Sequence, residues 1–334
     1  MIDSVTLIDP SLSASTPSVG TPSVAIIIVH WRHIDDTIEC LLSLARVDYP
    51  RCRIIVVDNG SSDFDDDAVR RAYPGVTLIA SNRNLGFTGG NNLGVARALQ
   101  EGADVVFLLN NDTIVRPEIL TTLLPALDDP RVGIVGPVIT YYDHPDRVWF
   151  GAGAFSRLFG YPYRRRPLEW DHRRHPADFI NGCALLAKRE VFEAVGLLCE
   201  DFFLYFEESD LCLRAARANF RCVLVSEPLV LHKVSASGGA RGSNRQTPDK
   251  AYYFGRNPFL LLRRNARGPW LMSGFLSQFA VILPYYALGC IASGNVRALL
   301  SYVHGMIDGL RGRAGERGPG STVELMPLRR GRLG

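Results

Sequence analysis

Short apolar runs alternate with segments of helical periodicity in the N-terminal part of the chain. Val24–Val29 is a β-branched run typical of a central strand, and Asp35–Ala45 then carries apolar residues at helical spacing. The same alternation predicts further strands at Ile54–Val57, Val76–Ile79 and Val105–Leu109, and further helices at Asp66–Tyr73, Thr88–Gln100 and Pro117–Leu127. Strands that alternate with helices in this way predict an α/β fold, in which a doubly wound, mostly parallel sheet has flanking helices.

The alternation loosens after the apolar run Val132–Ile139. Residues 141–178 are aromatic, basic and rich in Gly and Pro, which predicts long loops or a small antiparallel piece. Further strands are expected at Ala184–Leu186, Cys222–Val225 and Leu229–His232, and helical segments at Glu190–Val195 and Ser209–Ala218. Ser235–Thr247 is polar and Gly-rich, without apolar periodicity, and predicts a mobile loop.

Both ends of the chain differ from this pattern. Residues 1–22 are rich in Ser, Pro and Thr and predict a disordered leader rather than a signal peptide, and the basic segment 312–334 predicts a disordered tail. Trp270–Ser293 is apolar for long enough to cross a bilayer, but Gln278 and Pro284 interrupt it. A membrane span and a soluble hairpin stay open; we favour helices that lie on a membrane surface, because arginines flank the stretch on both sides.

Composition narrows the classes of function. The net charge of +3 is too small to indicate a nucleic-acid partner. The seven cysteines include no CxxC pair, so a zinc ribbon is not expected and a reducing, cytoplasmic compartment is.

Asn110-Asn111-Asp112 directly follows an apolar strand. In open α/β sheets ligands bind at the carboxyl ends of the strands, and hard oxygen ligands suit Mg²⁺ or Mn²⁺ on a diphosphate. The alternative is that Asp112 only caps a helix or bends a turn. His232 also ends an apolar strand and is either a metal ligand or a structural residue.

A second acidic segment contains Glu207, Glu208 and Asp210. Three like charges in four residues repel one another unless a cation or an arginine offsets them. An exposed helix start would also tolerate them, and Arg214 is placed to pair with Asp210 along one helix face.

Two loops next to strands are candidates for ligand contacts. Asn82–Asn92 is a Gly-rich strand-to-helix connection whose amides can approach a ligand, although it matches neither the dinucleotide-binding nor the P-loop pattern. Asp58 follows a strand and either accepts a hydrogen bond from a base or ribose or forms an Asx turn.

The ordered set of these segments resembles family-2 inverting glycosyltransferases of the GT-A fold, in particular the bacterial rhamnosyltransferase-like branch. The matching segments are Val24–Trp31, Ile55–Ser61, Asn84–Asn92, Leu108–Thr113, Gly182–Leu186 and Phe203–Arg214. The resemblance implies a GT-A domain over residues 23–265, with a nucleotide-binding half at 23–115 and an acceptor half at 116–265, followed by C-terminal apolar helices at 266–311.

The resemblance also implies roles for individual residues. Asp58 would contact the nucleobase, Asp112 and His232 would hold a divalent cation, Mg²⁺ or Mn²⁺, and Glu208 would be the base. Glu207 and Asp210 belong to the same catalytic segment, and the remaining nucleotide-sugar contacts would be His30, Asn84, Gly86, Asn91, Asn110 and Asn111. Asn110 stands where the family's DxD motif has its first carboxylate, so only Asp112 supplies one.

The expected function is inverting transfer of a sugar, with rhamnose as the first candidate, from a nucleoside-diphosphate sugar to a hydroxyl of a glycan or lipid-linked acceptor in cell-surface polysaccharide synthesis. The protein is then expected in the cytoplasm at the inner face of the membrane. A metal-dependent nucleotidyltransferase and a non-catalytic nucleotide-sugar binding module stay open as alternatives.

Overall fold

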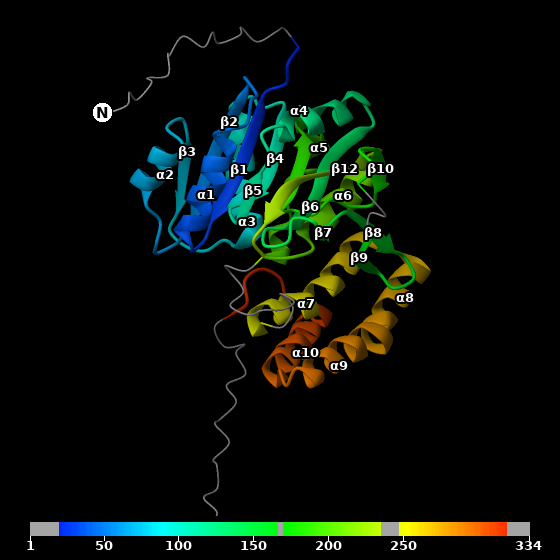
Figure 1. The fold of residues 1–334 in the computed structure, drawn as a ribbon. Helices are drawn as coiled ribbons and strands as arrows, with labels where there is room; N and C mark the ends of the chain where they lie inside the picture. Colours follow the sequence, from blue (N-terminus) through cyan, green and yellow to red (C-terminus); the bar gives the residue numbers. More distant parts are fainter. Residues whose placement is uncertain (1–19, 166–169, 235–246, 319–334) are drawn as a thin grey trace, which may run out of the picture.

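A ten-stranded mixed sheet forms the centre of the molecule (Figure 1). The computed structural model describes residues 20–165, 170–234 and 247–318. The strands are β1 (Val24–His30), β2 (Cys52–Asn59), β3 (Thr77–Ser81), β4 (Val105–Asn110), β5 (Thr113–Val115), β6 (Val132–Tyr141), β7 (Val148–Phe150), β8 (Ala152–Ser156), β9 (Tyr161–Arg165), β10 (Arg174–Ala177), β11 (Ala184–Lys188) and β12 (Arg221–His232). The α-helices are α1 (Ile34–Leu44), α2 (Asp66–Ala72), α3 (Gly86–Gln100), α4 (Ile119–Leu123), α5 (Arg189–Val195), α6 (Glu207–Arg217), α7 (Pro248–Asn265), α8 (Gly268–Ser277), α9 (Leu283–Ala292) and α10 (Val296–Leu310).

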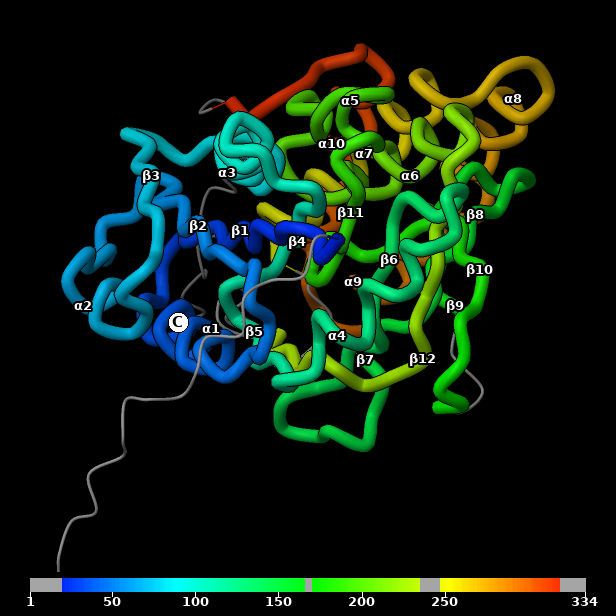
Figure 2. Tube along the Cα trace, turned by 90° about the horizontal axis from the view of Figure 1, so that it is seen from above, coloured from blue at the N-terminus to red at the C-terminus, as the bar shows by residue number. Residues whose placement is uncertain are grey.

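The parallel half of the sheet confirms the predicted pattern. β1 pairs in parallel with β2 and β4, and β2 pairs in parallel with β3. Helices α1, α2 and α4 cover one face and α3, α5 and α6 the other (Figure 2). Ile26, Ile27 and Ile28 have no exposed surface, as expected for strands covered on both faces.

The second half of the sheet is mixed. β11 lies between β4 and β6 and runs antiparallel to both, whereas β6 and β12 are parallel. The sequence predicts two strands, Cys222–Val225 and Leu229–His232, but the structure has one strand, β12. Register shifts on both sides of Pro228, which has no amide proton for the ladder, let both apolar runs stay in one strand.

The C-terminal helices lie below the sheet in Figure 1 and face the carboxyl ends of its parallel strands. A π-helical turn over Gln278–Ile282 joins α8 and α9 into one helix, Gly268–Ala292, of 25 residues. By length and composition alone this helix is able to cross a membrane. α7 and α10 touch backbone to backbone, since a Cβ at Gly305 would lie 2.0 Å from the carbonyl oxygen of Tyr252.

Residues 312–318 differ from the predicted disordered tail. After α10 they turn back toward the sheet, and the Gly315 amide donates to the Asp201 carbonyl at 2.8 Å. Residues 1–19, 235–246 and 319–334 lie outside the described residues. The predicted leader, the mobile loop Ser235–Thr247 and the rest of the tail therefore remain predictions.

Candidate active site

A cavity of about 1510 Å³ opens at the carboxyl edge of the parallel strands. One wall comes from the ends of β1 and β4 and the start of α3, another from β7 and β9, and the third from α6 and α7. The predicted residues that line it are Asn84, Gly86, Asn91, Asn110, Asn111, Asp112, Glu207, Glu208 and His232. The fold therefore brings both acidic segments of the sequence to one cavity.

The predicted Gly-rich connection is helical from Gly86 onward, and the turn that leads into α3 is held from behind by a buried asparagine. Asn59 is 2% exposed; its amide donates to Asn84 Oδ1 and to the Gly86 carbonyl, each at 3.0 Å, and its Oδ1 accepts from the Leu85 amide at 2.9 Å. Asn91, in the first turns of α3, donates to the Phe87 carbonyl. These bonds fix the loop before any ligand arrives.

Gly86 lets this loop touch the acidic segment. Its φ is +73°, and a Cβ there would lie 2.3 Å from the carbonyl oxygen of Phe203, so only glycine fits. The same carbonyl accepts from the Thr88 amide at 3.3 Å. The Gly-rich loop and the segment that precedes Glu207 are thus in direct contact.

Asp112 and His232 lie next to each other on the cavity wall. The His232 Nε2 atom lies 3.1 Å from Asp112 Oδ1. The Trp149 ring meets the imidazole edge to face, with centroids 4.3 Å apart, and His232 Nδ1 is buried without a hydrogen-bond partner among the described residues. Trp149 therefore contributes to the orientation of the imidazole. Burial alone would raise the pKa of Asp112, but the charge and hydrogen bond of His232 hold it below its ordinary value.

The spacing of Asp112 and His232 fits a divalent cation. Two neighbouring ligands of an octahedral ion lie about 3 Å apart when each bond is about 2.1 Å long. No group of three or more His, Cys, Asp or Glu side chains is arranged to hold a metal within the described residues. Within the described part of the chain the site would have two protein ligands, and diphosphate oxygens and water would occupy other positions, as is common for Mg²⁺.

Lys250 adds a cation that the sequence analysis did not identify. It lies in the first turn of α7, is 8% exposed and lines the cavity. Burial lowers the pKa of Lys250, whereas the charge of Asp112 raises it, so the two side chains interact electrostatically. The N-terminus of the 18-residue helix α7 adds its partial positive charge at the same place. This corner of the cavity suits a phosphate group.

Glu207 and Glu208 occupy a different environment. They form the first turn of α6, where no basic side chain bonds to either carboxylate in the described structure. Burial raises the pKa of Glu208 to about 7, and burial together with the charge of Glu208 raises the pKa of Glu207 well above its ordinary value. Glu207 Oε2 is buried and has no hydrogen-bond partner among residues 20–165, 170–234 and 247–318. A carboxylate whose pKa lies near neutrality is suited to accept a proton.

Comparison with known proteins decides the family. Residues 25–196 match the model described as Glycosyl transferase family 2. This chain belongs to glycosyl transferase family 2. It is a glycosyltransferase that takes its sugar from a nucleotide sugar.

Two relatives of this glycosyltransferase carry rhamnosyl names. It is 26% identical over 267 residues to the dTDP-rhamnosyl transferase RfbF of Shigella flexneri, covering 79% of this chain and 88% of that protein. It is 27% identical over 285 residues to an N-acetylglucosaminyl-diphospho-decaprenol L-rhamnosyltransferase of Mycobacterium tuberculosis, covering 77% and 90%. The solved mannosyltransferase PcManGT from Pyrobaculum calidifontis, in complex with GDP-Man and Mn²⁺, superposes with a TM-score of 0.57 at 17% identity, over 87% of this chain and 88% of that chain. The predicted GT-A fold is confirmed.

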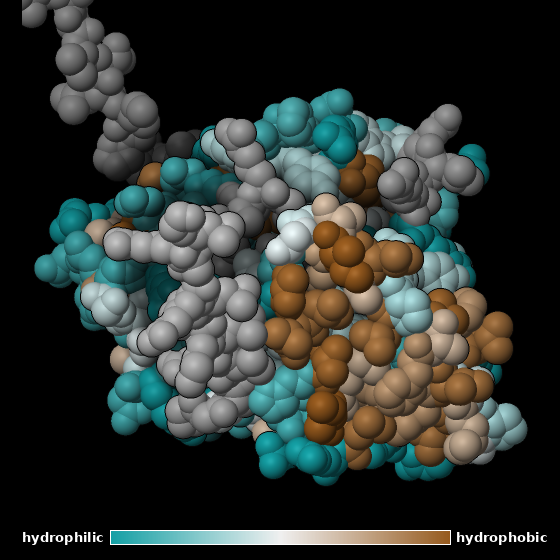
Figure 3. All heavy atoms as spheres, turned by 90° about the horizontal axis from the view of Figure 1, so that it is seen from below, coloured by the Kyte–Doolittle hydropathy of each residue, from teal (hydrophilic) through white to brown (hydrophobic). Residues whose placement is uncertain are grey.

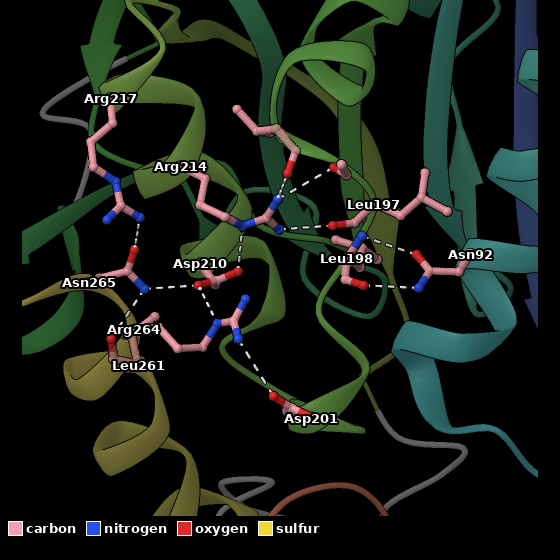
Figure 4. Close-up of polar contacts among 12 residues, drawn as sticks. Asn92, Leu197, Leu198, Asp201, Asp210, Arg214, Arg217, Leu261, Arg264 and Asn265 are labelled. Atoms are coloured by element: carbon pink, nitrogen blue, oxygen red, sulfur yellow. Dashed lines mark hydrogen bonds and ion pairs between the residues drawn. The ribbon is translucent and has the colours of Figure 1, made fainter.

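Asp210 does not line the cavity of the glycosyltransferase, which corrects its predicted place among the catalytic residues. Figure 4 shows its contacts instead. Its side chain is fully buried and accepts from Arg214 Nε at 2.7 Å, from Arg264 Nε at 3.3 Å and from Asn265 Nδ2 at 2.8 Å. Arg214 also donates a hydrogen bond to the carbonyl oxygen of Leu197. The arginines offset the charge of Asp210, as the spacing to Arg214 predicted, and the aspartate joins α6 to α7.

His30 and Asp58 also lie off the cavity wall, although both were predicted to contact the nucleotide sugar. His30 is fully buried and bonds Thr37 Oγ1 at 2.8 Å and Asp63 Oδ1 at 3.2 Å, and burial lowers its pKa. Asp58 Oδ1 accepts from the Ser61 amide at 2.9 Å, which is the Asx turn that the sequence left open. Both residues shape the loop after β2, and Asn59 next to them lines the cavity instead.

Proposed function

We propose that this glycosyltransferase moves rhamnose, with inversion, from a nucleoside-diphosphate rhamnose to a hydroxyl of a glycan or lipid-linked acceptor, with Glu208 as the base. The observation that carries the proposal is the contrast on the cavity wall: within the described part of the chain Glu208 has no cationic partner, and its pKa is raised to about 7, whereas Asp112 is paired with His232. One carboxylate suits proton transfer and the other suits the diphosphate.

The reaction is a single displacement. Glu208 accepts the proton of the acceptor hydroxyl as its oxygen forms a bond to the anomeric carbon from the face opposite the diphosphate. The bond from the anomeric carbon to the diphosphate oxygen breaks at the same time, and the nucleoside diphosphate leaves with that electron pair. One displacement inverts the anomeric centre.

Asp112, His232 and Lys250 are assigned to the leaving group. Asp112 and His232 would hold Mg²⁺ or Mn²⁺, and the cation, when bound, neutralises charge that develops on the diphosphate. Lys250 and the N-terminus of α7 add positive charge that is already in place before the reaction starts. Asn84 and Asn91, which also line the cavity, are proposed to bind the nucleotide part of the donor.

The proposed sugar and acceptor rest on the names of the relatives. Rhamnose follows from the two rhamnosyl names, and a thymidine nucleotide from the name of RfbF. A lipid-linked acceptor follows from the name of the mycobacterial relative. The cavity is large enough for a nucleotide sugar together with the end of an acceptor.

We place the enzyme at the inner face of the cell membrane. Apolar side chains gather over part of the lower face of the molecule (Figure 3). In α8 and α9, Met272, Leu276 and Tyr285 are each about 70% exposed. Arg267 and Arg297 flank this face in sequence and suit anionic headgroups. Leu276→Asp should reduce flotation with anionic vesicles at low salt, whereas Leu42→Asp, at an exposed leucine of α1, should not. Equal flotation of the two variants would contradict the placement.

Release of nucleoside diphosphate tests the reaction. Purified protein is incubated with nucleotide sugars, chosen by a thermal-shift panel, with and without acceptor and with Mn²⁺ or excess EDTA. The proposal expects nucleoside diphosphate release that needs both acceptor and cation. Pyrophosphate release would indicate a nucleotidyltransferase, and ligand binding without any release would indicate a binding module.

A further inference from the structure

Two polar side chains in the middle of α7 are fully buried and point to the segment that leads into Glu207. We infer that Arg256 and Asn257 are positioning residues, which hold this segment in the one conformation that presents Glu208 to the acceptor. The inference rests on the proposed function, because it takes Glu208 as the base.

The side-chain amide of Asn257 donates hydrogen bonds to backbone carbonyl oxygens of the segment. Its Nδ2 atom lies 3.1 Å from the carbonyl oxygen of Phe202 and 2.8 Å from those of Leu204 and Tyr205. One amide group thus donates to three of the five residues directly before Glu207. No other residue type of this size supplies two such donors on a short, stiff side chain.

Arg256 extends the same contact. Its guanidinium donates to the carbonyl oxygens of Asp201 at 3.1 Å and Phe202 at 2.8 Å, and its Nε donates to Asn257 Oδ1 at 2.8 Å. It also donates to the carbonyl of Gly315. The guanidinium lies 5.0 Å from the ring centre of Tyr253, which compensates part of the cost of burying its charge. In the described structure its hydrogen bonds go to neutral groups, four of them backbone or amide oxygens, so its role is to organise backbone carbonyls.

The segment needs such support because its backbone is strained. Phe203, Tyr205 and Phe206 have φ values of +62°, +71° and +75°. Such values are unfavourable in bulky residues and persist only where the surroundings fix them. Phe206 is the residue immediately before α6, so its conformation sets the direction of the first turn that carries Glu207 and Glu208.

α7 itself is fixed, so that it can serve as a support. Gly255 touches α10 through the carbonyl oxygen of Tyr302, 2.1 Å from an added Cβ, and Gly309 touches the Arg256 carbonyl in the same way at 2.6 Å. A helix packed backbone to backbone cannot shift without losing both contacts. α10 therefore fixes α7, α7 fixes the segment before Glu207, and the segment fixes the start of α6, which carries Glu208.

The test compares two buried asparagines of the same helix. Asn257→Ala removes the bonds to the strained segment, whereas the control Asn265→Ala removes bonds to Asp210 and to the Leu261 carbonyl. We expect kcat to fall about ten- to a hundredfold in Asn257→Ala, because small misplacements of a catalytic group cost that much, while KM and Kd for the donor stay unchanged. Asn265→Ala should lower Tm but leave kcat within about twofold.

Two further variants keep the test decisive. Asn257→Ser keeps one donor and should give an intermediate kcat, and it replaces Asn257→Ala if that variant does not fold. Glu208→Gln tests the proposed function on its own: if it stays active, the base assignment fails, whatever Asn257 does. If Glu208→Gln is inactive but the Asn257 variants keep full kcat, or if Asn265→Ala loses as much kcat as Asn257→Ala, the inference is overturned.

Discussion

Asp112 and Glu208 are carboxylates on the wall of one cavity, yet their surroundings have opposite effects on proton affinity. Asp112 faces His232 and the first turn of α7 with Lys250, and its pKa is lowered. Glu208 lies beside Glu207 and makes no ion pair with a basic side chain of the described structure, and burial raises its pKa to about 7. Groups whose environments push their pKa values apart are the ones between which an enzyme divides charge stabilisation and proton transfer. The comparison indicates that the fold keeps Asp112 ionised and Glu208 ready to accept a proton.

The largest expected effect comes from removing the carboxylate that is proposed as the base. Glu208→Gln keeps the size of the side chain but cannot take a proton, so kcat should fall roughly 10²–10⁴-fold. Donor affinity should change little, because the donor contacts are assigned to other residues. Transfer assays and calorimetric titration with the nucleotide sugar measure the two. Near-normal turnover in Glu208→Gln, together with loss in Glu207→Gln, would move the base to Glu207.

The next largest effect is expected from removing the charge of Asp112, the other carboxylate of the comparison. Asp112→Asn leaves His232 without its ionised partner, and kcat should fall roughly 10²–10³-fold, as when one strong electrostatic contact to a developing charge is removed. Activity of the unchanged protein should disappear in EDTA and return with Mn²⁺ or Mg²⁺. Full activity in excess EDTA would show that Lys250 and the α7 N-terminus neutralise the diphosphate without a cation.

Lys250→Met should have a smaller effect. A hydrogen bond to a charged group contributes about 1.5–3 kcal/mol, which corresponds to a loss of about ten- to a hundredfold in kcat. Product inhibition by nucleoside diphosphate should weaken in parallel, because the same phosphate contact is lost. A variant with unchanged kcat and unchanged inhibition would exclude Lys250 from the diphosphate site.

The smallest effect is on thermal stability. It tests whether the pKa of Glu208 is raised in the folded protein. Glu208 holds its proton more tightly in the folded protein, at a pKa of about 7, than at its ordinary value of 4.5, so its contribution is present below pH 4.5 and is lost as pH rises through 7. Glu208→Gln should therefore have a higher Tm than the unchanged protein at pH 8. The difference should vanish near pH 4, and an equal difference at both pH values would show that burial does not perturb Glu208.

Much of the parallel half could be predicted from sequence, because each strand is a continuous apolar run followed by a periodic helix. The insertion of β11 between β4 and β6 could not, since a short apolar run carries no information about its neighbours. β12 was predicted as two strands because Ser226-Glu227-Pro228 has the composition of a turn. The register shift that keeps it in the sheet depends on the pairing with β6.

The candidate site shows the same division. Asp112, Glu208 and His232 were identified because polar residues after apolar strands are conspicuous in the sequence. Asp210 was placed with them because Arg264 and Asn265, which engage it in the core, lie 54 and 55 residues further along the chain. Lys250 was missed because one lysine at a helix start has no distinctive pattern, and only the folded chain brings it to the cavity.

Residues 312–318 contact the segment before Glu207, and this affects the order in which parts of the enzyme fold during synthesis. Synthesis proceeds from the N-terminus, and early parts of a chain fold while later parts are still being added. The carbonyls of Phe202 and Leu204 acquire their Asn257 donor only after α7 has been synthesised, and the Asp201 carbonyl meets the Gly315 amide only after residue 315 has been added. A nascent chain can thus hold the complete sheet and a formed Asp112–His232 pair while the segment before Glu207 still lacks these contacts. The conformation of that segment therefore depends on residues that are added more than a hundred positions after it.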